Sequence, residues 1–196
     1  MLVVMARWEP NARERLVIAA LDLFAEQGYD ATTVSQIAER AGGLTKTTFF
    51  RYFPDKREVL FAAGQEIHGQ IVADAIATAP EPFTPLSAVA AALDALTSTF
   101  GDDRREFCAR LLAVIAASSE LRERSVAKHA ALAEAMTGAL HKRGVPDPAA
   151  SLAADLGVRA WDHAFAQWAD PGGTEAFPDL ARRALGELRA AIASLD

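Results

Sequence analysis

The chain has 196 residues, is 51% hydrophobic and carries a net charge of −6, which allows one or two domains with a buried core. Its single cysteine, Cys108, excludes an internal disulfide and fits a reducing cytoplasm, where we expect the protein to lie. The apolar run at residues 1–5 is too short for a signal peptide or a membrane span, so we expect no membrane association. Alanine and leucine dominate and β-branched residues are sparse, which predicts an all-α protein.

The N-terminal part predicts an arm and a first helix. Residues 1–11 are expected to form a flexible arm, and the helix is predicted from about Arg13 to Gln27, with Gly28 ending it. Its apolar face is expected to close a small core with the next two helices, and Tyr29 to pack at the corner. The residues expected in this core are Leu16, Ala20, Leu23, Phe24, Val34, Ile37, Leu44, Phe49 and Phe53.

Residues 33–56 (TVSQIAERAGGLTKTTFFRYFPDK) predict two short helices joined by a glycine turn. Thr33 and Gln36 have the spacing of a capping box, and apolar residues follow them at helical spacing. A pair of glycines stops this helix. The next helix is predicted over residues 44–50, with Thr45 as its N-cap. Two helices joined by a tight glycine turn, the second with a polar face, are typical of a helix-turn-helix.

The basic residues of this acidic chain gather between residues 40 and 57, where five cations and one carboxylate give a net charge of +4. Such a window is suited to an anion such as the DNA backbone. Asp55 and Glu58 have the spacing of a second capping box, which predicts a helix from Asp55 to about Thr78. Lys56 would then lie at the positive end of a helix dipole, where a phosphate relieves an unfavourable interaction.

The run from Leu16 to Leu60 resembles the DNA-binding domain of the TetR family of transcriptional regulators. It contains a helix ending in Glu-x-Gly-Tyr, followed by Thr-Thr, Ala-Gly and Phe-x-Tyr-Phe-x-x-Lys. The resemblance implies about nine helices, with a three-helix helix-turn-helix head at residues 1–55. Residues 56–196 would form a helical bundle for ligand binding and dimerisation. The helix after Asp55 would be the lever between the ligand pocket and DNA.

The turn of the helix-turn-helix departs from the family pattern. The family usually has one residue between Ala-Gly and the Ser or Thr of the recognition helix, but here Gly43 and Leu44 both intervene. The turn is therefore one residue longer, and Leu44 can still fill its core position if Gly43 bulges. A small shift or rotation of the recognition helix would follow.

The resemblance places the DNA contacts on and around the recognition helix. Lys46 and Thr47 are expected to meet base edges, and Thr45 to cap the helix or touch a phosphate. Phe50 stands where the family often has tyrosine, which leaves an apolar contact with a thymine methyl or a sugar. The alternative for each residue is an ordinary surface side chain. The full set expected at the DNA is Thr33, Thr45, Lys46, Thr47, Thr48, Phe50, Arg51, Tyr52 and Lys56.

Three prolines at positions 80, 82 and 85 break the chain, and five more helices are predicted after them from proline, glycine and serine signals. They cover about residues 86–100, 104–117, 119–143, 149–169, and from 174–178 almost to the C-terminus. The last two are strongly apolar on one side, and the resemblance implies that they form a four-helix interface with a second copy. The alternative is that both pack within one chain. The expected interface residues are Leu152, Leu156, Trp168, Leu180, Ala184, Leu188 and Ile192.

A pocket for a small-molecule effector is expected within the C-terminal bundle. Its aromatic residues predict an apolar or aromatic effector, although side chains at helical spacing also suit plain core. The candidate lining residues are Phe61, His68, Phe100, Phe107, Met136, Trp161 and Phe165. No cofactor or metal site is expected, because the four histidines lack ligand spacing, and no catalytic motif is recognisable.

These features favour a homodimeric, TetR-like repressor that binds a pseudo-palindromic DNA operator and is released by a small molecule. Two alternatives stay open. One is a TetR-like activator or a regulator that responds to a protein. The other is a helical ligand carrier or enzyme with a vestigial DNA-binding head, against which the lack of catalytic spacing and the intact capping and cation pattern weigh.

Overall fold

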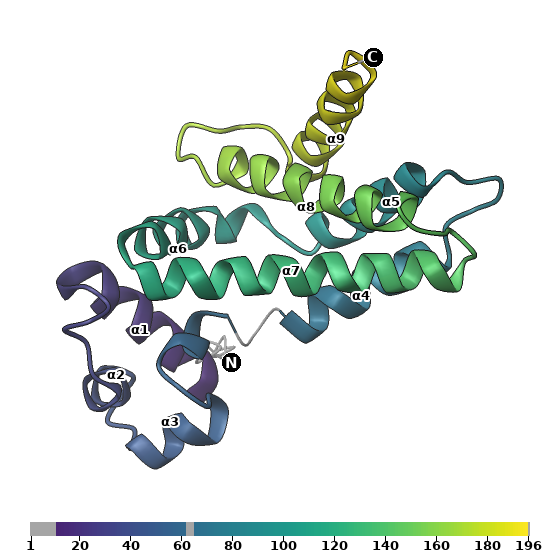
Figure 1. The fold of residues 1–196 in the computed structure, drawn as a ribbon. Coiled ribbons are helices and arrows are strands. Elements are labelled where there is room, and N and C mark those ends of the chain that lie inside the picture. Colours follow the sequence, from purple (N-terminus) through teal and green to yellow (C-terminus); the bar gives the residue numbers. More distant parts are fainter. Residues whose placement is uncertain (1–10, 62–64, 196) are drawn as a thin grey trace, which may run out of the picture. The chain divides into compact units, whose positions relative to one another are not determined.

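The computed structural model describes residues 11–61 and 65–195, and the chain divides into two compact units, Met1–Ala62 and Ala63–Asp196. Over the described residues it contains nine α-helices, two short 3-10 helices and no strand (Figure 1). The prediction of an all-α protein with about nine helices is confirmed. The first unit is named the head below, and the second the bundle. The predicted arm lies almost entirely outside the described residues.

Side-chain caps start the helices of the head. These helices are α1 (Ala12–Gln27), α2 (Val34–Arg40), α3 (Lys46–Tyr52) and the 3-10 helix η1 (Arg57–Leu60). Asn11 caps α1 and Thr45 caps α3 through side-chain oxygens that accept backbone amides. Thr33 and Gln36 form the reciprocal capping box that their spacing predicted. These caps satisfy amides that have no partner in the first helical turn.

The core of the head is close to the predicted one. Two of the expected residues, Val34 and Leu44, are only half-buried. Tyr29 packs edge-on against Phe24 with ring centroids 5.1 Å apart, which confirms its place at the corner. The residues confirmed as buried are Leu16, Ala20, Leu23, Phe24, Ile37, Phe49 and Phe53.

The turn between α2 and α3 depends on two adjacent glycines. Gly42 and Gly43 have φ angles of +97° and +74°, a left-handed conformation that residues with a Cβ rarely adopt. The amide of Leu44 donates to the carbonyl of Ala38 at 2.8 Å, which closes the end of α2. Leu44 is half-buried while Gly43 is exposed, as expected for a turn lengthened at Gly43.

Replacing Gly42 with alanine is expected to lower the free energy of unfolding by about 1–2 kcal/mol, the cost of left-handed backbone for an L-residue. A Cβ at this position would also lie 2.8 Å from Nη1 of Arg15. Chemical denaturation of wild type and variant measures the difference. Gly138→Ala in the bundle is the control. A Cβ there meets no atom within 4 Å, so alanine should stabilise the helix by about 1 kcal/mol. A gain in stability from Gly42→Ala would contradict this account of the turn.

The prediction of one continuous helix from Asp55 to about Thr78 is wrong. Residues 57–60 form the 3-10 helix η1, Phe61 follows as its C-cap, and α4 (Gln65–Ala77) is a separate helix. The carboxylate of Asp55 does cap the first of these, because it accepts the amide of Glu58 at 3.0 Å. The lever helix that the family resemblance implied therefore does not begin at Asp55.

The boundary between the units lies at residue 62 and not at residue 55. The 3-10 helix η1 packs on α1 and buries Val59 and Leu60 in the head. These apolar side chains complete the core of the head, which explains why the chain after Asp55 stays with it. Burial of two such side chains stabilises the head by about 3–6 kcal/mol before entropy is counted.

The bundle is built around α7, its longest helix. It consists of α4 (Gln65–Ala77), α5 (Pro85–Thr97), η2 (Asp102–Arg104), α6 (Arg105–Ala117), α7 (Ser119–Lys142), α8 (Ala149–Trp168) and α9 (Phe177–Ala193). α7 packs against α4, α6 and α8, and α5 packs against α4, α8 and α9 (Figure 1). From α5 onward the predicted helices agree with these bounds to within a few residues, because local caps and prolines set most of their ends.

Candidate functional site

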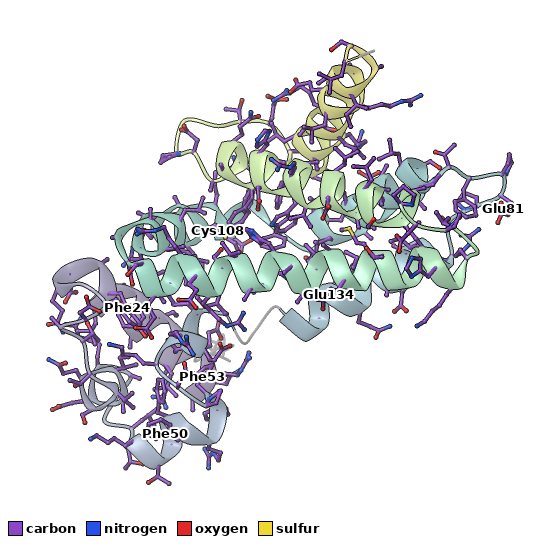
Figure 2. The ribbon with its side chains drawn as sticks, viewed as in Figure 1. Phe24, Phe50, Phe53, Glu81, Cys108 and Glu134 are labelled. Atoms are coloured by element: carbon purple, nitrogen blue, oxygen red, sulfur yellow. The ribbon has the colours of Figure 1, made fainter. Side chains whose placement is uncertain are left out.

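The exposed face of α3 is the strongest candidate site in the head. Lys46, Thr47, Phe50 and Arg51 are all exposed, whereas Phe49 is fully buried. Figure 2 shows Phe50 on this helix. The helix is therefore anchored from behind and presents polar and cationic side chains outward. This is the arrangement that a recognition helix needs to enter a major groove.

Phe50 is the large apolar residue of this face. It is 53% exposed, and its ring meets Phe49 edge-on with centroids 5.5 Å apart. The ring has no hydroxyl to offer a phosphate. Its exposed carbon surface suits a thymine methyl or a sugar.

The predicted threonines serve first as helix caps. The hydroxyl of Thr33 donates to Oε1 of Gln36 at 2.9 Å and accepts the amide of Gln36 at 3.3 Å. The hydroxyl of Thr45 accepts the amide of Thr48 at 3.1 Å, and the two hydroxyl oxygens lie 3.0 Å apart. Thr33 and Thr45 are exposed, so capping fixes where their oxygens would meet a phosphate.

Part of the positive charge in the basic window is neutralised within the head. Arg40 forms a bidentate pair with Glu26 of α1, with both nitrogen–oxygen distances at 2.9 Å. The hydrogen bonding to Glu26 raises the pKa of Arg40. Arg57 lies 3.4 Å from a carboxylate oxygen of Asp55. The net charge of the window therefore overstates what it offers to an external anion.

The cations of α3 are different. Lys46 and Arg51 are exposed, and neither has a carboxylate partner in the part of the chain that the structure describes. Arg51 donates to the hydroxyl of Tyr52 at 3.3 Å and lies over its ring, 5.0 Å from the centroid. This contact holds Arg51 and the half-buried Tyr52 together at the end of α3. The positive charge that this part of the head offers to an external anion therefore lies mainly on α3.

The structure gives Lys56 a place inside the head that the sequence analysis missed. Its ammonium donates to the carbonyls of Tyr29 at 2.7 Å and Thr32 at 3.0 Å, and lies 3.9 Å from the centroid of the Tyr29 ring. Lys56 therefore ties the α1–α2 loop to the segment after α3. Because its ammonium is engaged within the head, we do not propose Lys56 as a contact to a DNA phosphate. Its partners are 24 and 27 residues away, so no local pattern could reveal them.

Lys56→Met is expected to destabilise the head by about 1–3 kcal/mol, because two part-buried carbonyls lose a charged donor while the aliphatic stem is kept. Urea denaturation measures the loss. At temperatures where the variant is folded, the salt dependence of its DNA binding should match that of wild type. Unchanged stability, together with a salt slope reduced by about one unit for each head, would return Lys56 to the DNA backbone.

The head is a three-helix unit in which a glycine turn joins the two short helices α2 and α3. This arrangement defines a helix-turn-helix domain of the DNA-binding class. Residues 16–63 match the family model described as bacterial regulatory proteins, tetR family. The head thus matches the DNA-binding domain of the TetR family, as its motif indicated.

Three similar proteins place this assignment in context. The HTH-type transcriptional regulator TcmR of Streptomyces glaucescens is 38% identical over 96 residues, which cover 49% of this chain and 42% of TcmR. The chain thus spans less than half the length of this relative. FadR from Bacillus subtilis with stearoyl-CoA superposes with a TM-score of 0.54 at 21% identity, over 89% of this chain and 96% of that one. The SmeT–triclosan complex gives 0.56 at 20%, over 93% and 91%. At these identities the two structures establish the fold alone.

The residues predicted to line an effector pocket do not all come together. Phe61 is buried in the head, whereas the other six belong to the bundle. Met136 of α7 is fully buried and Phe107 of α6 is half-buried, both as part of the bundle core. For these two residues the plain-core alternative describes what the structure contains.

The remaining four residues form an aromatic cluster. The ring of His68 lies 5.7 Å from Phe100 and 6.1 Å from Trp161, and Trp161 stacks on Phe165 at 5.6 Å. His68, Phe100 and Phe165 are only half-buried, so part of their ring surface stays accessible. Helices α4 and α8 and the α5–η2 segment thus contribute to one aromatic surface in the bundle.

His68 is held neutral by this cluster. Burial, together with the smaller effect of the nearby charge of Lys128, lowers the pKa of His68 to about 4. Unfolding would return it to about 6.5. Above that pH both states are neutral, whereas between pH 6.5 and 4 only the unfolded state binds the proton. Stability should therefore fall as the pH falls through this window, and stop falling on this account below pH 4.

His68→Phe is expected to flatten that pH dependence. Phenylalanine keeps an aromatic ring at this position and removes the titrating group. In wild type, His68 should change the unfolding equilibrium constant by up to about tenfold for each pH unit between 6.5 and 4, and this contribution should be absent in the variant. Urea denaturation at several pH values gives the comparison with wild type. His163→Phe on the exposed side of α8 is the matched control. An identical pH profile for wild type and His68→Phe would contradict the burial of a neutral imidazole.

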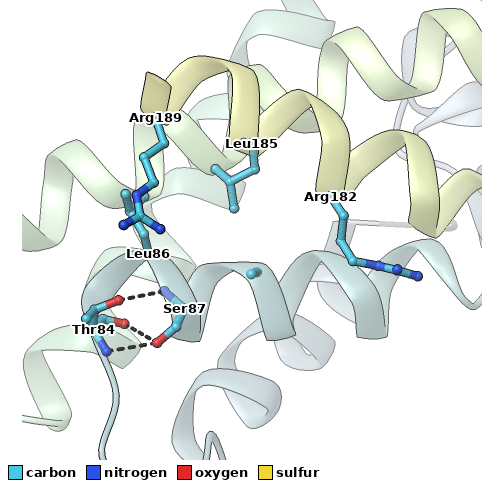
Figure 3. A pocket seen from close by; sticks show the side chains of 8 residues that line it. Thr84, Leu86, Ser87, Arg182, Leu185 and Arg189 are labelled. Carbon is cyan, nitrogen blue, oxygen red and sulfur yellow. Dashed lines mark hydrogen bonds between the residues drawn. The ribbon is translucent and has the colours of Figure 1, made fainter. Parts of the chain in front are cut away.

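A separate groove of about 280 Å³ lies between α5 and α9 (Figure 3), and none of the predicted effector residues lines it. The hydroxyls of Thr84 and Ser87 at one end are engaged in the capping box of α5. Arg182 pairs with Asp94 at 3.0 Å. The residues that line the groove are Thr84, Leu86, Ser87, Ala90, Arg182, Leu185, Gly186 and Arg189.

Most residues predicted at a dimer interface are buried inside the bundle. Leu156 and Trp168 of α8 and Leu180 and Ala184 of α9 are at most 8% exposed. They pack where α8 meets α9 and where α5 covers both. These four side chains have almost no surface to give to a second copy, so the alternative of packing within one chain holds for them. An apolar stripe does not reveal which neighbour covers it.

The other three predicted interface residues keep accessible surface. Leu152 of α8 is 53% exposed, Ile192 of α9 is 39% exposed, and Leu188 is half-buried. Leu195 continues the stripe of α9 and is 83% exposed. The C-terminal end of α9 extends away from the other helices of the bundle (Figure 1). The apolar stripe of α9 therefore runs on beyond the part that α5 and α8 cover.

Residues 11–61 and 65–195 contain neither a metal-binding cluster nor a helix that could span a membrane. Within these ranges no group of three or more His, Cys, Asp and Glu side chains is arranged to hold a metal ion. No helix there has both the length and the hydropathy of a membrane span. Cys108 is buried and its burial raises the pKa of the thiol to about 11, as expected for a structural cysteine.

Proposed function

We propose that this protein is a sequence-specific DNA-binding transcriptional regulator whose α3 enters the major groove. The observation that carries the proposal is the outer face of α3, where Lys46 and Arg51 are exposed without carboxylate partners in the described chain. Lys46 and Thr47 read base edges, and Phe50 contacts a thymine methyl or a sugar. The phosphate contacts are made by Thr33, Thr45, Thr48, Arg51 and Tyr52.

The regulator acts as a homodimer in the cytoplasm. Two copies place their α3 helices in successive major grooves, about 34–36 Å apart, on a pseudo-palindromic operator. The support is the apolar stripe of α9, in which Leu188, Ile192 and Leu195 continue past the covered part of the helix. Leu152 of α8 adds a second exposed apolar side chain.

A small molecule bound in the bundle controls the regulator, which is a repressor. The aromatic cluster around Trp161 is the proposed site, and an apolar or aromatic effector suits it. FadR with stearoyl-CoA and SmeT with triclosan support a ligand site in this fold. The effector releases DNA only if it binds more tightly to a dimer whose heads no longer match the operator spacing.

The test is a mobility shift of the purified protein on the DNA upstream of its own gene, at two salt concentrations, with and without competitor. We expect a competitor-resistant shift that weakens steeply with salt. A selection from random DNA covers an operator that lies elsewhere. If the folded protein selects no sequence, the carrier or enzyme with a vestigial head becomes the better account. A reporter fused to the target promoter then distinguishes a repressor from an activator. Deletion of the gene raises reporter expression from a repressed promoter and lowers it from an activated one.

A further inference from the structure

Lys128 on α7 is a half-buried cation without a hydrogen bond or an ion pair among the described residues. Other cations of the bundle that are this shielded are neutralised. Arg105 and Arg143, whose side chains are 15% and 14% exposed, form ion pairs with Asp102 and Glu81. Removing a charge from water without a partner costs free energy, so folded chains rarely leave one in this state.

The surroundings of Lys128 disfavour its charge. Burial lowers the pKa of Lys128, and repulsion by Arg124, one turn earlier on α7, lowers it further, while Cys108 acts in the opposite direction. The Cys108 thiol stays protonated at neutral pH, because its pKa is raised to about 11. The Lys128 ammonium in turn acts on His68 of α4, whose pKa it helps to lower, and on Cys108 of α6, where it partly offsets the rise caused by burial. Three helices therefore converge on one cation that no carboxylate of the described chain neutralises.

The carboxylate of Asp162 on α8 is already engaged. Asp162 of α8 lies with Oδ1 3.2 Å from Nε2 of His129, the residue that follows Lys128 on α7. Between these two described residues, Asp162 and Lys128, there is no ion pair. The cation is therefore open to an anion that comes from outside the chain.

The same place offers an apolar surface. His68, which Lys128 influences directly, has its ring 5.7 Å from Phe100 and 6.1 Å from Trp161. His68 and Phe100 keep part of their surface accessible. A neutral imidazole can also donate one hydrogen bond to an acid group, while the charge is left to Lys128. An ammonium beside accessible aromatic rings matches a molecule with an acid group on an apolar body.

We infer that Lys128 and the aromatic cluster of His68, Phe100, Trp161 and Phe165 bind an organic anion with an aromatic or apolar body, whose acid group pairs with the Lys128 ammonium. The inference rests on the proposed effector function and adds the charge of the effector to it. Binding would supply the missing partner of a shielded cation, which makes an anion a much better ligand than its neutral analogue.

The test uses two fluorescent probes with the same ring skeleton and different charge. They are 1-anilinonaphthalene-8-sulfonate and the neutral N-phenyl-1-naphthylamine, titrated into the full chain at neutral pH. Wild type should bind the sulfonate at least about tenfold more tightly, as a charge-assisted hydrogen bond allows. Lys128→Met should remove that preference, while its affinity for the neutral probe changes by less than about twofold, since only the charged contact is lost.

Two variants control for charge and position. Lys142→Met removes an exposed lysine from the last turn of the same helix and should leave both affinities unchanged. Lys128→Arg keeps the positive charge and should keep the preference for the sulfonate. Should the methionine variant fail to fold, Lys128→Gln takes its place. A wild type that binds both probes equally would overturn the inference, as would a preference that survives in Lys128→Met.

The DNA mobility shift, repeated with the same variants, separates this inference from the proposed function. Lys128→Met lies in the bundle and should bind operator DNA as wild type does when no probe is present. If no form of the protein binds DNA, the proposed regulator is wrong, yet the probe affinities still decide whether the site prefers anions. If DNA binding is intact and the preference is absent, the anion site alone is refuted.

Discussion

Phe49→Ala is expected to unfold the head and abolish DNA binding. The side chain is fully buried, and its ring packs 5.4 Å from that of Phe53, which caps the end of α3. Truncating a buried phenylalanine costs about 3–5 kcal/mol through lost burial and the cavity left behind. That loss is a large part of the roughly 5–15 kcal/mol that stabilises a whole domain. Urea denaturation and a mobility shift measure the two effects.

Phe50→Ala, at the next position, provides the matched contrast. Its ring is 53% exposed, so its removal should change stability by no more than about 0.5 kcal/mol. DNA binding should nevertheless weaken, because the variant loses the proposed apolar contact with a sugar or a thymine methyl. Equal losses of stability in the two variants would show that α3 is not anchored through Phe49 as described. Full DNA binding by Phe50→Ala would remove Phe50 from the interface.

The parts of the head that the sequence predicted are those set by neighbours within a few residues. The capping box of Thr33 and Gln36 and the cap formed by Thr45 are contacts across three positions, so residue type and spacing define them. The glycine turn is equally local. Gly42 and Gly43 both have left-handed backbone conformations, which glycine adopts at a lower free-energy cost than any other residue type. Local chemistry therefore located the helix-turn-helix to within one or two residues.

The errors arose where distant residues decide the outcome. Lys56 looked like a phosphate contact from its place at a helix start, but Tyr29 and Thr32 bind its ammonium across the fold. The segment after Asp55 looked like the start of a long helix, but Val59 and Leu60 are needed in the core of the head. In both cases tertiary contacts override a local preference, which spacing alone cannot reveal.

The bundle shows the same limit on a larger scale. Trp168 was predicted at a dimer interface, yet its ring stacks on Phe177 at 4.9 Å inside the chain. Helical periodicity identified which side of α8 is apolar, but could not say whether α9 or a second copy covers it. The cluster of His68, Phe100 and Trp161 did come together, because α4, α8 and the segment between α5 and η2 meet there.

The double variant Lys46→Ala/Arg51→Ala is expected to have the largest effect on DNA binding without unfolding the head. Both side chains are exposed and make no ion pair in the described part of the chain, so their removal should change stability little. If each head loses two cations that neutralise DNA phosphates, the dimer loses four, and the slope of log affinity against log salt falls by about 3.6. If wild type and variant bind equally at 1 M salt, this change in slope makes the affinity of the variant lower by a factor on the order of a thousand at 0.1 M salt.

The single variants and one control separate the roles within this effect. Arg51→Ala should weaken binding to all sequences equally, as expected for a phosphate contact, whereas Lys46→Ala should also change base preference. Arg40→Gln removes a cation of the same basic window that Glu26 already neutralises, so the salt slope should hardly change. If Arg40→Gln lowers the slope as much as Arg51→Ala, the positive charge of the whole window attracts the DNA. If the slope falls only for Lys46 and Arg51, the attraction comes from the exposed face of α3, and the fold sets the interface by neutralising the other cations.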